Sequence, residues 1–276
     1  MKLANLSGRA VLVVDGGVVD VAEASDGGFG PDPMDCYERW DEFTAWASTP
    51  STVTGPLDES ALGNPIPQPR QIFAVGLNYG AHAAETGMKA PERPAVFTKF
   101  VSSLTGPFDD VRLVGETTDW EVELVVVVGR PCDHVASADA WAHVAGLTVG
   151  QDLSDRTLQF AAGNQFSLGK SRTGYGPLGP WVVSVDEFDD PDDLALTCTV
   201  GDVVRQDARS SDLIYDVPAL IEELSAITTL LPGDIVFTGT PSGVGVAMTP
   251  PQYLRPGDVV ESWIEGIGTI RNTMVG

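Results

Sequence analysis

The hydrophobic positions of this chain fall into short runs separated by Gly, Pro and Asp, a pattern typical of β-strands joined by turns. The runs interpreted as strands are Ile72–Gly76, Glu121–Val128, Leu147–Gly150, Trp181–Val185, Leu194–Val200, Ile235–Thr238 and Val259–Ile264. One helix is well marked, because Asp216 can cap it and apolar residues recur at helical spacing from Val217 to Ile227. The pattern predicts an α+β fold that is predominantly β.

The N-terminal part of the chain has a different organisation. Two apolar runs flank the Asp-Gly-Gly turn at 15–17, which predicts a β-hairpin, and a predicted helix with two tryptophans follows. Pro50–Pro69 is rich in Pro, Ser, Thr and Gly without periodicity, as expected of a linker. We therefore predict a small N-terminal, β-containing domain with its linker at 1–65 and a catalytic domain at 66–276.

Composition narrows the class of protein. The 276 residues are 43% hydrophobic, enough for a large core, and no run reaches the roughly 18 apolar residues that a membrane span needs. The N-terminus lacks the continuous apolar segment of a signal peptide, so a cytoplasmic protein is expected. The net charge of −23 repels phosphate backbones and anionic membranes, which argues against nucleic acid or a membrane as partner.

The three cysteines, Cys36, Cys132 and Cys198, are odd in number and have no close spacing. Neither a disulfide framework nor a zinc site is therefore indicated, and reduced, mostly buried thiols are expected. The sequence also contains no GxxxxGK[ST] or GxSxG segment, which removes support for ATP or serine-nucleophile chemistry.

The first chemical signal is a set of alternating carboxylates. Asp119, Glu121 and Glu123 share one face of a predicted strand that runs into Val125–Val128. Taken alone, such a segment is more often a solvated acidic face. The four valines, however, make the strand apolar on both faces, and like charges at the entrance to a buried strand are costly without a cation. Oxygen-only ligands suit a hard divalent ion, Mg²⁺ or Mn²⁺.

The second signal is His82 with Glu85, three residues apart on a short predicted helix. At this spacing the carboxylate can orient the imidazole and raise its basicity. A lone histidine is more often a surface or capping residue, but His134 and His143 have no acidic residue three positions on. Met88–Arg93, which follows, has the composition of a mobile loop that could close over a site.

Two further segments allow an ordinary and a functional interpretation. The polar run at 150–159, with Gly169-Lys170-Ser171 after it, is either a solvated turn or the rim of a pocket. The Gly-rich run at 238–245 is either a tight turn after a strand or a place where backbone amides and hydroxyls approach an anion.

Together these segments resemble the fumarylacetoacetate hydrolase family, in the same order and at similar separations, from about Gln71 to the C-terminus. The matching motifs are Gly76–Glu85, Glu121–Leu124, Asp152–Gln159, Gly169–Ser171 and Thr238–Gly245. The resemblance implies a mixed β-roll catalytic domain and a homodimer. One departure is Asp155-Arg156-Thr157, where many relatives have Ala-Arg-Asp, which affects the substrate end of the site.

The resemblance also implies a role for individual residues. The implied ligands of Mg²⁺ or Mn²⁺ are Glu121, Glu123 and Asp152. The implied catalytic residues are His82 and Glu85, which deprotonate the attacking water, and Lys170, which contacts the substrate's enolate. The residues implied to hold or surround the substrate are Tyr79, Arg156, Gln159 and Thr240. Asp119 has no firm family role, and support of the ligands is expected of it.

The chemistry implied is hydrolysis of a carbon–carbon bond in a small 1,3-dicarbonyl acid of the acylpyruvate or fumarylpyruvate type. The alternative is an oxaloacetate decarboxylase, or a hydratase or tautomerase of 2-oxo acids, because a metal and an enolate-stabilising lysine serve any reaction through an enolate. The His82–Glu85 pair favours hydrolysis, which needs an activated water. A catalytically silent binding protein would be expected to have broken motifs, and all are present.

Overall fold

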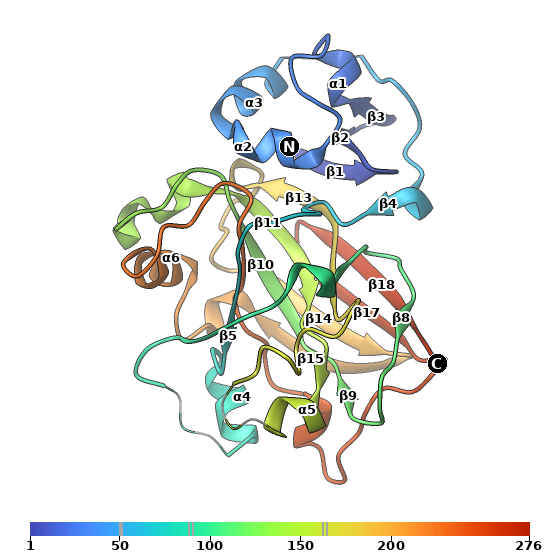
Figure 1. Ribbon diagram of the computed structural model, residues 1–276, viewed down its shortest axis with the longest axis vertical. Coiled ribbons are helices and arrows are strands. Elements are labelled where there is room, and N and C mark those ends of the chain that lie inside the picture. The colour runs from blue at the N-terminus through green and yellow to red at the C-terminus, as the bar shows by residue number, and fades with distance from the viewer. Residues whose placement is uncertain (50–51, 88, 90, 162, 164) are drawn as a thin grey trace.

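The computed structural model describes residues 1–49, 52–87, 89, 91–161, 163 and 165–276 (Figure 1). Pro50 and Ser51 of the predicted linker, and Met88 and Ala90 of the predicted closing loop, lie outside the described residues. The fold is α+β and dominated by strands, so the predicted fold class is confirmed.

The largest sheet has 11 strands in the order β3-β2-β1-β13-β11-β10-β16-β5-β6, with β4 paired to β1 and β7 to β13. Its strands are β1 (Lys2–Leu6), β2 (Arg9–Val14), β3 (Gly17–Asp20), β4 (Leu62–Gly63), β5 (Ile72–Gly76), β6 (Ala95–Thr98), β7 (Leu104–Thr105), β10 (Val122–Val128), β11 (Val144–Gln151), β13 (Gly176–Ser184) and β16 (Ile235–Phe237). The predicted strands at 121–128 and 147–150 therefore lie side by side, and the predicted strand at 72–76 lies in the same sheet, separated from the former by β16.

A second sheet of five strands, in the order β15-β14-β17-β18-β8, packs beside the first, and β9 and β12 form a two-stranded pair. These strands are β8 (Val111–Arg112), β9 (Thr118–Asp119), β12 (Ser154–Asp155), β14 (Ala195–Val200), β15 (Val203–Arg209), β17 (Val259–Ile264) and β18 (Gly268–Val275). The hydrophobic pattern did not predict β15, because it is mostly exposed and four of its seven residues are polar, Arg205, Gln206, Asp207 and Arg209.

The helices are short. The α-helices are α1 (Val21–Ala24), α2 (Pro33–Glu38), α3 (Trp40–Ala47), α4 (Gly80–Glu85), α5 (Arg156–Ala161) and α6 (Val217–Ser225). The 3₁₀ helices are η1 (Glu59–Ala61), η2 (Val101–Ser103), η3 (Ser137–His143), η4 (Val185–Glu187), η5 (Ser210–Asp212) and η6 (Gly245–Ala247). None of the described helices is both long and apolar enough to cross a membrane.

Helix α6 forms for the reasons that its sequence indicated. The Asp216 side chain accepts a hydrogen bond from the backbone N–H of Ala219 at 2.8 Å, which caps the first turn. Val217, Leu220, Ile221 and Leu224 are buried on one face. The inclusion of Ile227 in that apolar face was wrong, because the helix ends at Ser225 and Ile227 is 74% exposed.

The N-terminal segment forms the predicted hairpin and helix and lies at one end of the molecule, away from α4 and α5 (Figure 1). Strand β1 pairs with β13, Lys2 opposite Val183, so this segment extends the main sheet. The boundary near residue 65 stays a prediction. The three cysteines are free and buried, as expected.

Strand β10 lies at the centre of the main sheet, between β11 and β16, and all seven of its residues are buried. Such a strand has an apolar neighbour on each face, as the run of valines predicted. Glu121 immediately precedes this strand and Glu123 is its second residue, and both are buried. The sheet therefore places two carboxylates in the interior of the protein.

Candidate metal and substrate site

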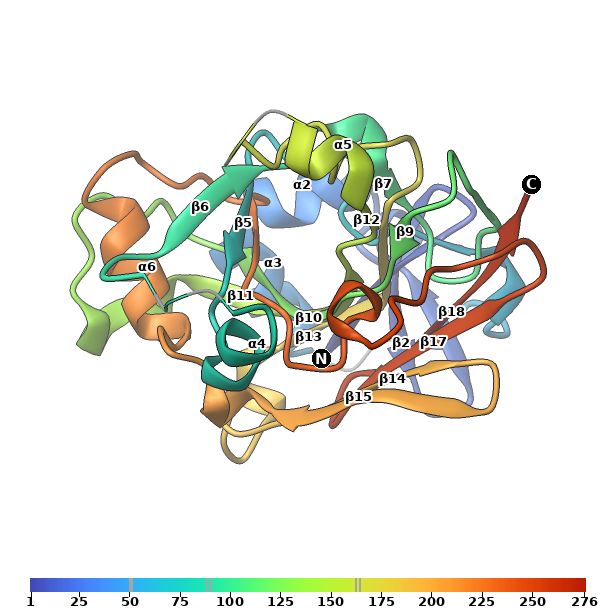
Figure 2. The same cartoon turned by 90° about the horizontal axis from the view of Figure 1, so that it is seen from below.

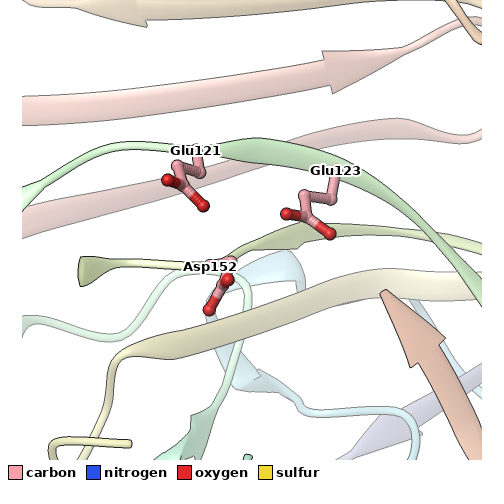
Figure 3. A group of neighbouring side chains, drawn as sticks. All are labelled: Glu121, Glu123 and Asp152. Carbon is pink, nitrogen blue, oxygen red and sulfur yellow. The ribbon is translucent and has the colours of Figure 1, made fainter. Parts of the chain in front are cut away.

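Three buried carboxylates converge where β10 begins and β11 ends. Glu123 is opposite Gly150 in the antiparallel register, and the backbone N–H of Asp152 donates to the carbonyl of Glu121 at 2.9 Å. One oxygen of each carboxylate, from Glu121, Glu123 and Asp152, lies within 4.8 Å of the others (Figure 3). The exposed fractions are 4%, 2% and 0% for the three residues in that order. The pairing of two strands thus brings together carboxylates that are about 30 residues apart in sequence.

Two lysines share the charge of this cluster. Lys170 Nζ contacts a carboxylate oxygen of Glu121 and lies 2.7 Å from Asp152 Oδ2. Lys99 Nζ donates to Asp152 Oδ1 at 2.7 Å and to two backbone carbonyls. Burial disfavours the charged form of Lys170, but Asp152 and Glu121 outweigh it and raise its pKa, whereas burial lowers the pKa of Lys99. Each carboxylate oxygen of Asp152 therefore contacts a lysine ammonium, which balances its negative charge.

Glu123 differs from its neighbours. Its one described polar contact is the backbone N–H of Gly239, at 2.8 Å, and it forms no ion pair with another described residue. Burial raises the pKa of Glu123 well above the ordinary carboxyl value, and the charges of Asp152 and Glu121 raise it further. For Glu121, burial acts in the same direction, but Lys170 and Arg156 outweigh it and lower the pKa to about 2. A divalent cation would supply the positive charge that Glu123 lacks, so the three carboxylates fit a hard metal ion.

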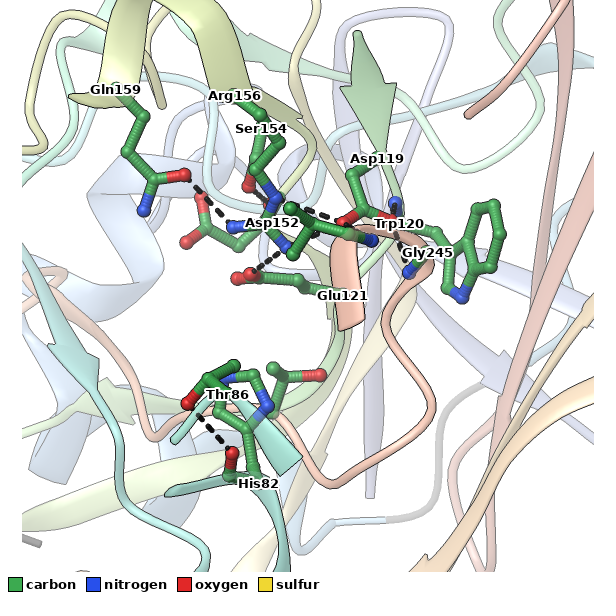
Figure 4. A network of polar contacts seen from close by, with 12 residues as sticks. His82, Thr86, Asp119, Trp120, Glu121, Asp152, Ser154, Arg156, Gln159 and Gly245 are labelled. Atoms are coloured by element: carbon green, nitrogen blue, oxygen red, sulfur yellow. Dashed lines mark hydrogen bonds and ion pairs between the residues drawn. The ribbon is translucent and has the colours of Figure 1, made fainter. Parts of the chain in front are cut away.

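Arg156 connects the carboxylate cluster to the Gly-rich turn (Figure 4). Its Nε donates to Asp119 Oδ2 at 2.8 Å, and Nη2 lies 2.7 Å from Glu121 Oε1. Nη1 donates to Gln159 Oε1 at 2.8 Å. Asp119 in turn accepts the backbone N–H of Gly245 at 2.7 Å. Asp119 therefore does not face the metal position; it holds Arg156, which holds Glu121.

The His82–Glu85 pair forms as its spacing indicated. His82 Nδ1 lies 2.8 Å from Glu85 Oε1, and Glu85 Oε2 accepts the backbone N–H of Gly243 at 2.9 Å. The carboxylate is thus fixed at both oxygens and orients the ring. With Nδ1–H donated to Glu85, Nε2 has a free lone pair and can accept a proton. His82 is 6% exposed and lines the same cavity as the carboxylates.

That cavity has a volume of about 490 Å³, part of it open to solvent. Helices α4 and α5 both contribute lining residues, and Figure 2 shows α5 above and α4 below the position of β10 in that view. The predicted site residues that line it are His82, Glu121, Glu123, Asp152, Arg156, Gln159, Lys170 and Thr240. Its other walls are mostly apolar: Val75, Gly76, Leu77, Thr86, Phe97, Phe160, Phe166 and Val246.

The remaining predicted residues, Glu85 and Tyr79, do not line the cavity. The Glu85 side chain is 22% exposed and contacts His82, whereas Tyr79 is 2% exposed with a hydroxyl that has no hydrogen-bond partner among the described residues. Burial raises the pKa of Tyr79, and the charge of Glu123 adds to the effect. The Thr240 hydroxyl lines the cavity but already donates its proton to the carbonyl of Val122 at 2.9 Å. It can therefore offer a substrate only a lone pair or its backbone amide.

Sequence reasoning did not assign a role to Lys99. It is 2% exposed and its ammonium is enclosed by Asp152 and the carbonyls of Lys170 and Tyr175. The available signal was a lysine between Phe97 and Phe100 in a chain with only 16 basic residues. No spacing in the sequence linked it to Asp152, 53 residues away.

Comparison with known proteins agrees with this arrangement. Residues 71–275 match the family described as fumarylacetoacetate (FAA) hydrolase, C-terminal. The oxaloacetate tautomerase Fahd2a, mitochondrial, of Rattus norvegicus is 40% identical over 213 residues, which are 76% of this chain and 68% of the relative.

Two crystal structures extend the likeness to the whole chain. A Mycobacterium smegmatis protein provisionally assigned as HpcE has a TM-score of 0.96 and 50% identity, over 100% of this chain and 99% of the other. The maleylpyruvate hydrolase from Sphingobium sp. SYK-6, in complex with manganese(II) and pyruvate, has a TM-score of 0.78 and 27% identity, over the same shares.

Proposed function

The chain belongs to the fumarylacetoacetate hydrolase family, and from this premise we propose that it is a divalent-metal-dependent hydrolase of a small 1,3-dicarbonyl acid of the acylpyruvate or fumarylpyruvate type. The observation that carries the proposal is the position of His82, which Glu85 orients and which faces the same cavity as the three carboxylates. A base beside a metal position is what hydrolysis requires.

Glu121, Glu123 and Asp152 would hold the metal, Mg²⁺ or Mn²⁺. The choice rests on the oxygen-only donors, on the uncompensated Glu123 and on the manganese(II) ion and pyruvate in the related maleylpyruvate hydrolase structure. A bound divalent ion would polarise the two oxygens of a 1,3-dicarbonyl or 2-oxo acid and stabilise an enolate.

In the proposed reaction the proton would pass to a residue of the protein, and the electron pair would pass to one half of the substrate. His82 Nε2 takes a proton from water, and the water oxygen attacks the acyl carbonyl carbon. The carbon–carbon bond breaks, and its electron pair passes to the pyruvate half as an enolate that a proton then converts to pyruvate. Lys170 lies at the cavity wall, where its ammonium can contact the enolate oxygen.

The other lining residues would position the substrate. Gln159 has committed its side-chain oxygen to Arg156, so its Nε2 amide remains a donor toward the cavity. Arg156 and Thr240 would hold the polar end through groups not used within the protein. The unpartnered Tyr79 hydroxyl lies behind them and would support the same end.

A second candidate function is the interconversion of the keto and enol forms of oxaloacetate, or another decarboxylase or hydratase reaction of 2-oxo acids. The 40% identity to the rat oxaloacetate tautomerase favours it. Tautomerisation and decarboxylation would use the metal position and Lys170 but need no activated water, whereas hydration would need one. Hydrolysis and tautomerisation therefore differ in whether His82 has water or a substrate carbon as its proton donor.

The discriminating experiment compares specificity constants. Purified protein with Mn²⁺ is assayed for acylpyruvate cleavage, oxaloacetate tautomerisation and oxaloacetate decarboxylation. The proposal requires that acylpyruvate cleavage has the highest kcat/KM and that His82→Ala removes it. If oxaloacetate has the higher kcat/KM, the second candidate replaces the first, and the effect of His82→Ala on its tautomerisation shows whether His82 is the base there.

We further propose a cytoplasmic homodimer, with a small-molecule acid as the partner at the site. The dimer follows from the family resemblance, and the location from the expectation drawn from the sequence. Light scattering after size-exclusion chromatography should give twice the chain mass of 29.2 kDa. A single-chain mass at assay concentration would contradict the dimer.

A further inference from the structure

Two consecutive backbone amides at the beginning of β10 are bound by glutamine side chains. The N–H of Glu121 donates to Gln151 Oε1 at 2.8 Å, and the N–H of Val122 donates to Gln206 Oε1 at 2.9 Å. Both glutamines are 1% exposed. Because Glu121 and Glu123 flank Val122 in the sequence, the direction of their carboxylates depends on how this stretch of backbone is held.

Gln206, Val122 and Thr240 form a closed ring of three hydrogen bonds. The N–H of Val122 donates to Gln206 Oε1, Gln206 Nε2 donates to Thr240 Oγ1 at 2.7 Å, and Thr240 Oγ1 donates to the carbonyl of Val122 at 2.9 Å. Gln206 Nε2 also donates to the carbonyl of Pro241 at 2.8 Å. The amide therefore uses its oxygen and both of its N–H groups, which fixes its orientation and that of the Thr240 hydroxyl.

The ring connects three segments of the chain beside Glu123. Gln206 lies on β15 in the five-stranded sheet, Val122 lies on β10 in the main sheet, and Thr240 lies in the Gly-rich run after β16. Gly239, which precedes Thr240, donates its N–H to Glu123 Oε2 at 2.8 Å. Strand β16 pairs with β10 further along that strand. At Val122 the Gln206 amide therefore supplies the hydrogen bond that a neighbouring strand supplies elsewhere.

A buried amide can also serve the fold alone, and Asn272 on β18 of the same sheet is an example. It is 1% exposed, and its Nδ2 donates to the carbonyls of Gly106 and Asp109 at 3.2 and 2.9 Å. Neither Asn272 nor these two partners line the cavity. Gln206 differs, because one of its partners, Thr240, does line the cavity.

We propose that Gln206 is a positioning residue for the metal site and that it acts through this ring. The inference rests on the proposed function, because it concerns the same site. Gln206 does not itself line the cavity. It holds the backbone between Glu121 and Glu123 at a fixed distance from the segment that carries Gly239 and Thr240. Without the ring, the two carboxylates would no longer be held in one orientation, and binding of a cation would weaken.

The first test measures Mn²⁺ affinity by calorimetry. Gln206→Met keeps the length of the side chain but removes its hydrogen bonds, so the Mn²⁺ dissociation constant should rise about tenfold or more. Asn272→Leu is the matched control, because it also removes a buried amide from the five-stranded sheet, and its dissociation constant should stay within about twofold of the parent. Thermal denaturation verifies that both variants are folded. Equal effects in the two variants, or no effect in Gln206→Met, would mean that Gln206 only supports the fold.

A double-mutant cycle tests the ring itself. If the ring acts as a unit, Gln206→Met combined with Thr240→Val should weaken Mn²⁺ binding by no more than about twofold beyond the larger single effect. Effects that multiply would show that the two residues act independently and would overturn the inference. Thr240→Ser keeps the hydroxyl and should bind Mn²⁺ more tightly than Thr240→Val does. This second pair decides if Gln206→Met does not fold, since equal affinities in it contradict the ring.

Assays of hydrolysis separate this inference from the proposed function. If the parent protein binds Mn²⁺ but does not cleave acylpyruvates, the proposed function fails, and the affinities still decide the role of Gln206. If the parent cleaves acylpyruvates and Gln206→Met binds Mn²⁺ as tightly as the parent does, the inference fails and the function stands. A parent protein that binds no Mn²⁺ would contradict both.

Discussion

The two functional parts of the cavity are built differently. The carboxylate part rests on two paired central strands, and its charged side chains contact one another from several directions. The dyad part rests on the short helix α4 and on one carboxylate, Glu85, that joins His82 to the backbone of Gly243. The carboxylate part can bind a cation without the dyad, and the dyad can supply a base without binding a cation. Metal binding and proton transfer should therefore be separable by mutation.

The largest expected effect comes from removing the uncompensated carboxylate. Glu123→Gln should lower activity by about 1,000-fold or more, because it removes a proposed metal ligand. It should leave the melting temperature of the metal-free protein equal or higher, since Glu123 has no ion pair with a described residue and burial opposes its charge. Activity assays and thermal denaturation without metal test the two halves of this prediction. A marked loss of metal-free stability would mean that Glu123 has a structural partner.

The next largest effect should come from the dyad. His82→Ala should lower hydrolysis by about 100-fold or more and leave the Mn²⁺ dissociation constant within about threefold of the parent, because the imidazole is proposed as a base and not as a ligand. Calorimetric titration with Mn²⁺ provides the second measurement. If His82→Ala lost the metal together with the activity, metal binding and proton transfer would not be separable, and His82 would have to be a ligand or support one.

A smaller effect is expected at the residue that orients the base. Glu85→Gln keeps a hydrogen-bond acceptor for His82 but removes the charge, so hydrolysis should fall by about tenfold. Steady-state kinetics measure this loss, and unchanged activity would show that Glu85 only stabilises the fold.

The smallest effect should come from Asp119, which does not line the cavity but contacts Arg156 and the backbone N–H of Val246, two residues that do. Asp119→Asn removes the charge that holds Arg156, so we expect KM to rise about threefold to tenfold with little change in metal affinity. Steady-state kinetics at saturating Mn²⁺ distinguish this from loss of a ligand, in which kcat would fall steeply.

The sequence was sufficient for the local features of the site and insufficient for its long-range contacts. Glu121 and Glu123 could be placed because they alternate into a run of valines, and His82 with Glu85 because one helical turn separates them. Asp152 came from the family resemblance, and the reason for its position is the register of β10 with β11. The pairing of β10 with β11 joins two segments that are distant in the sequence, and neither segment alone specifies which residue of the other it faces.

The features that were missed share this cause. Lys99 reaches Asp152 through the placement of β6 on β5, and the Thr240 hydroxyl is already engaged by Val122 on a neighbouring strand. Strand β15 was not expected, because its side chains are mostly polar and exposed and its partner β14 fixes it through the backbone. In each case the deciding interaction joins residues that are distant in the sequence, or joins backbone groups that carry no sequence signal.

The most direct test of the account is reconstitution of the metal. The protein is stripped with a chelator, assayed for acylpyruvate hydrolysis, and titrated with Mg²⁺ or Mn²⁺ while bound metal is counted. We predict no hydrolysis after stripping, binding of one ion per chain, and recovery of activity in proportion to occupancy. Full activity in a sample shown to be free of metal would contradict the account.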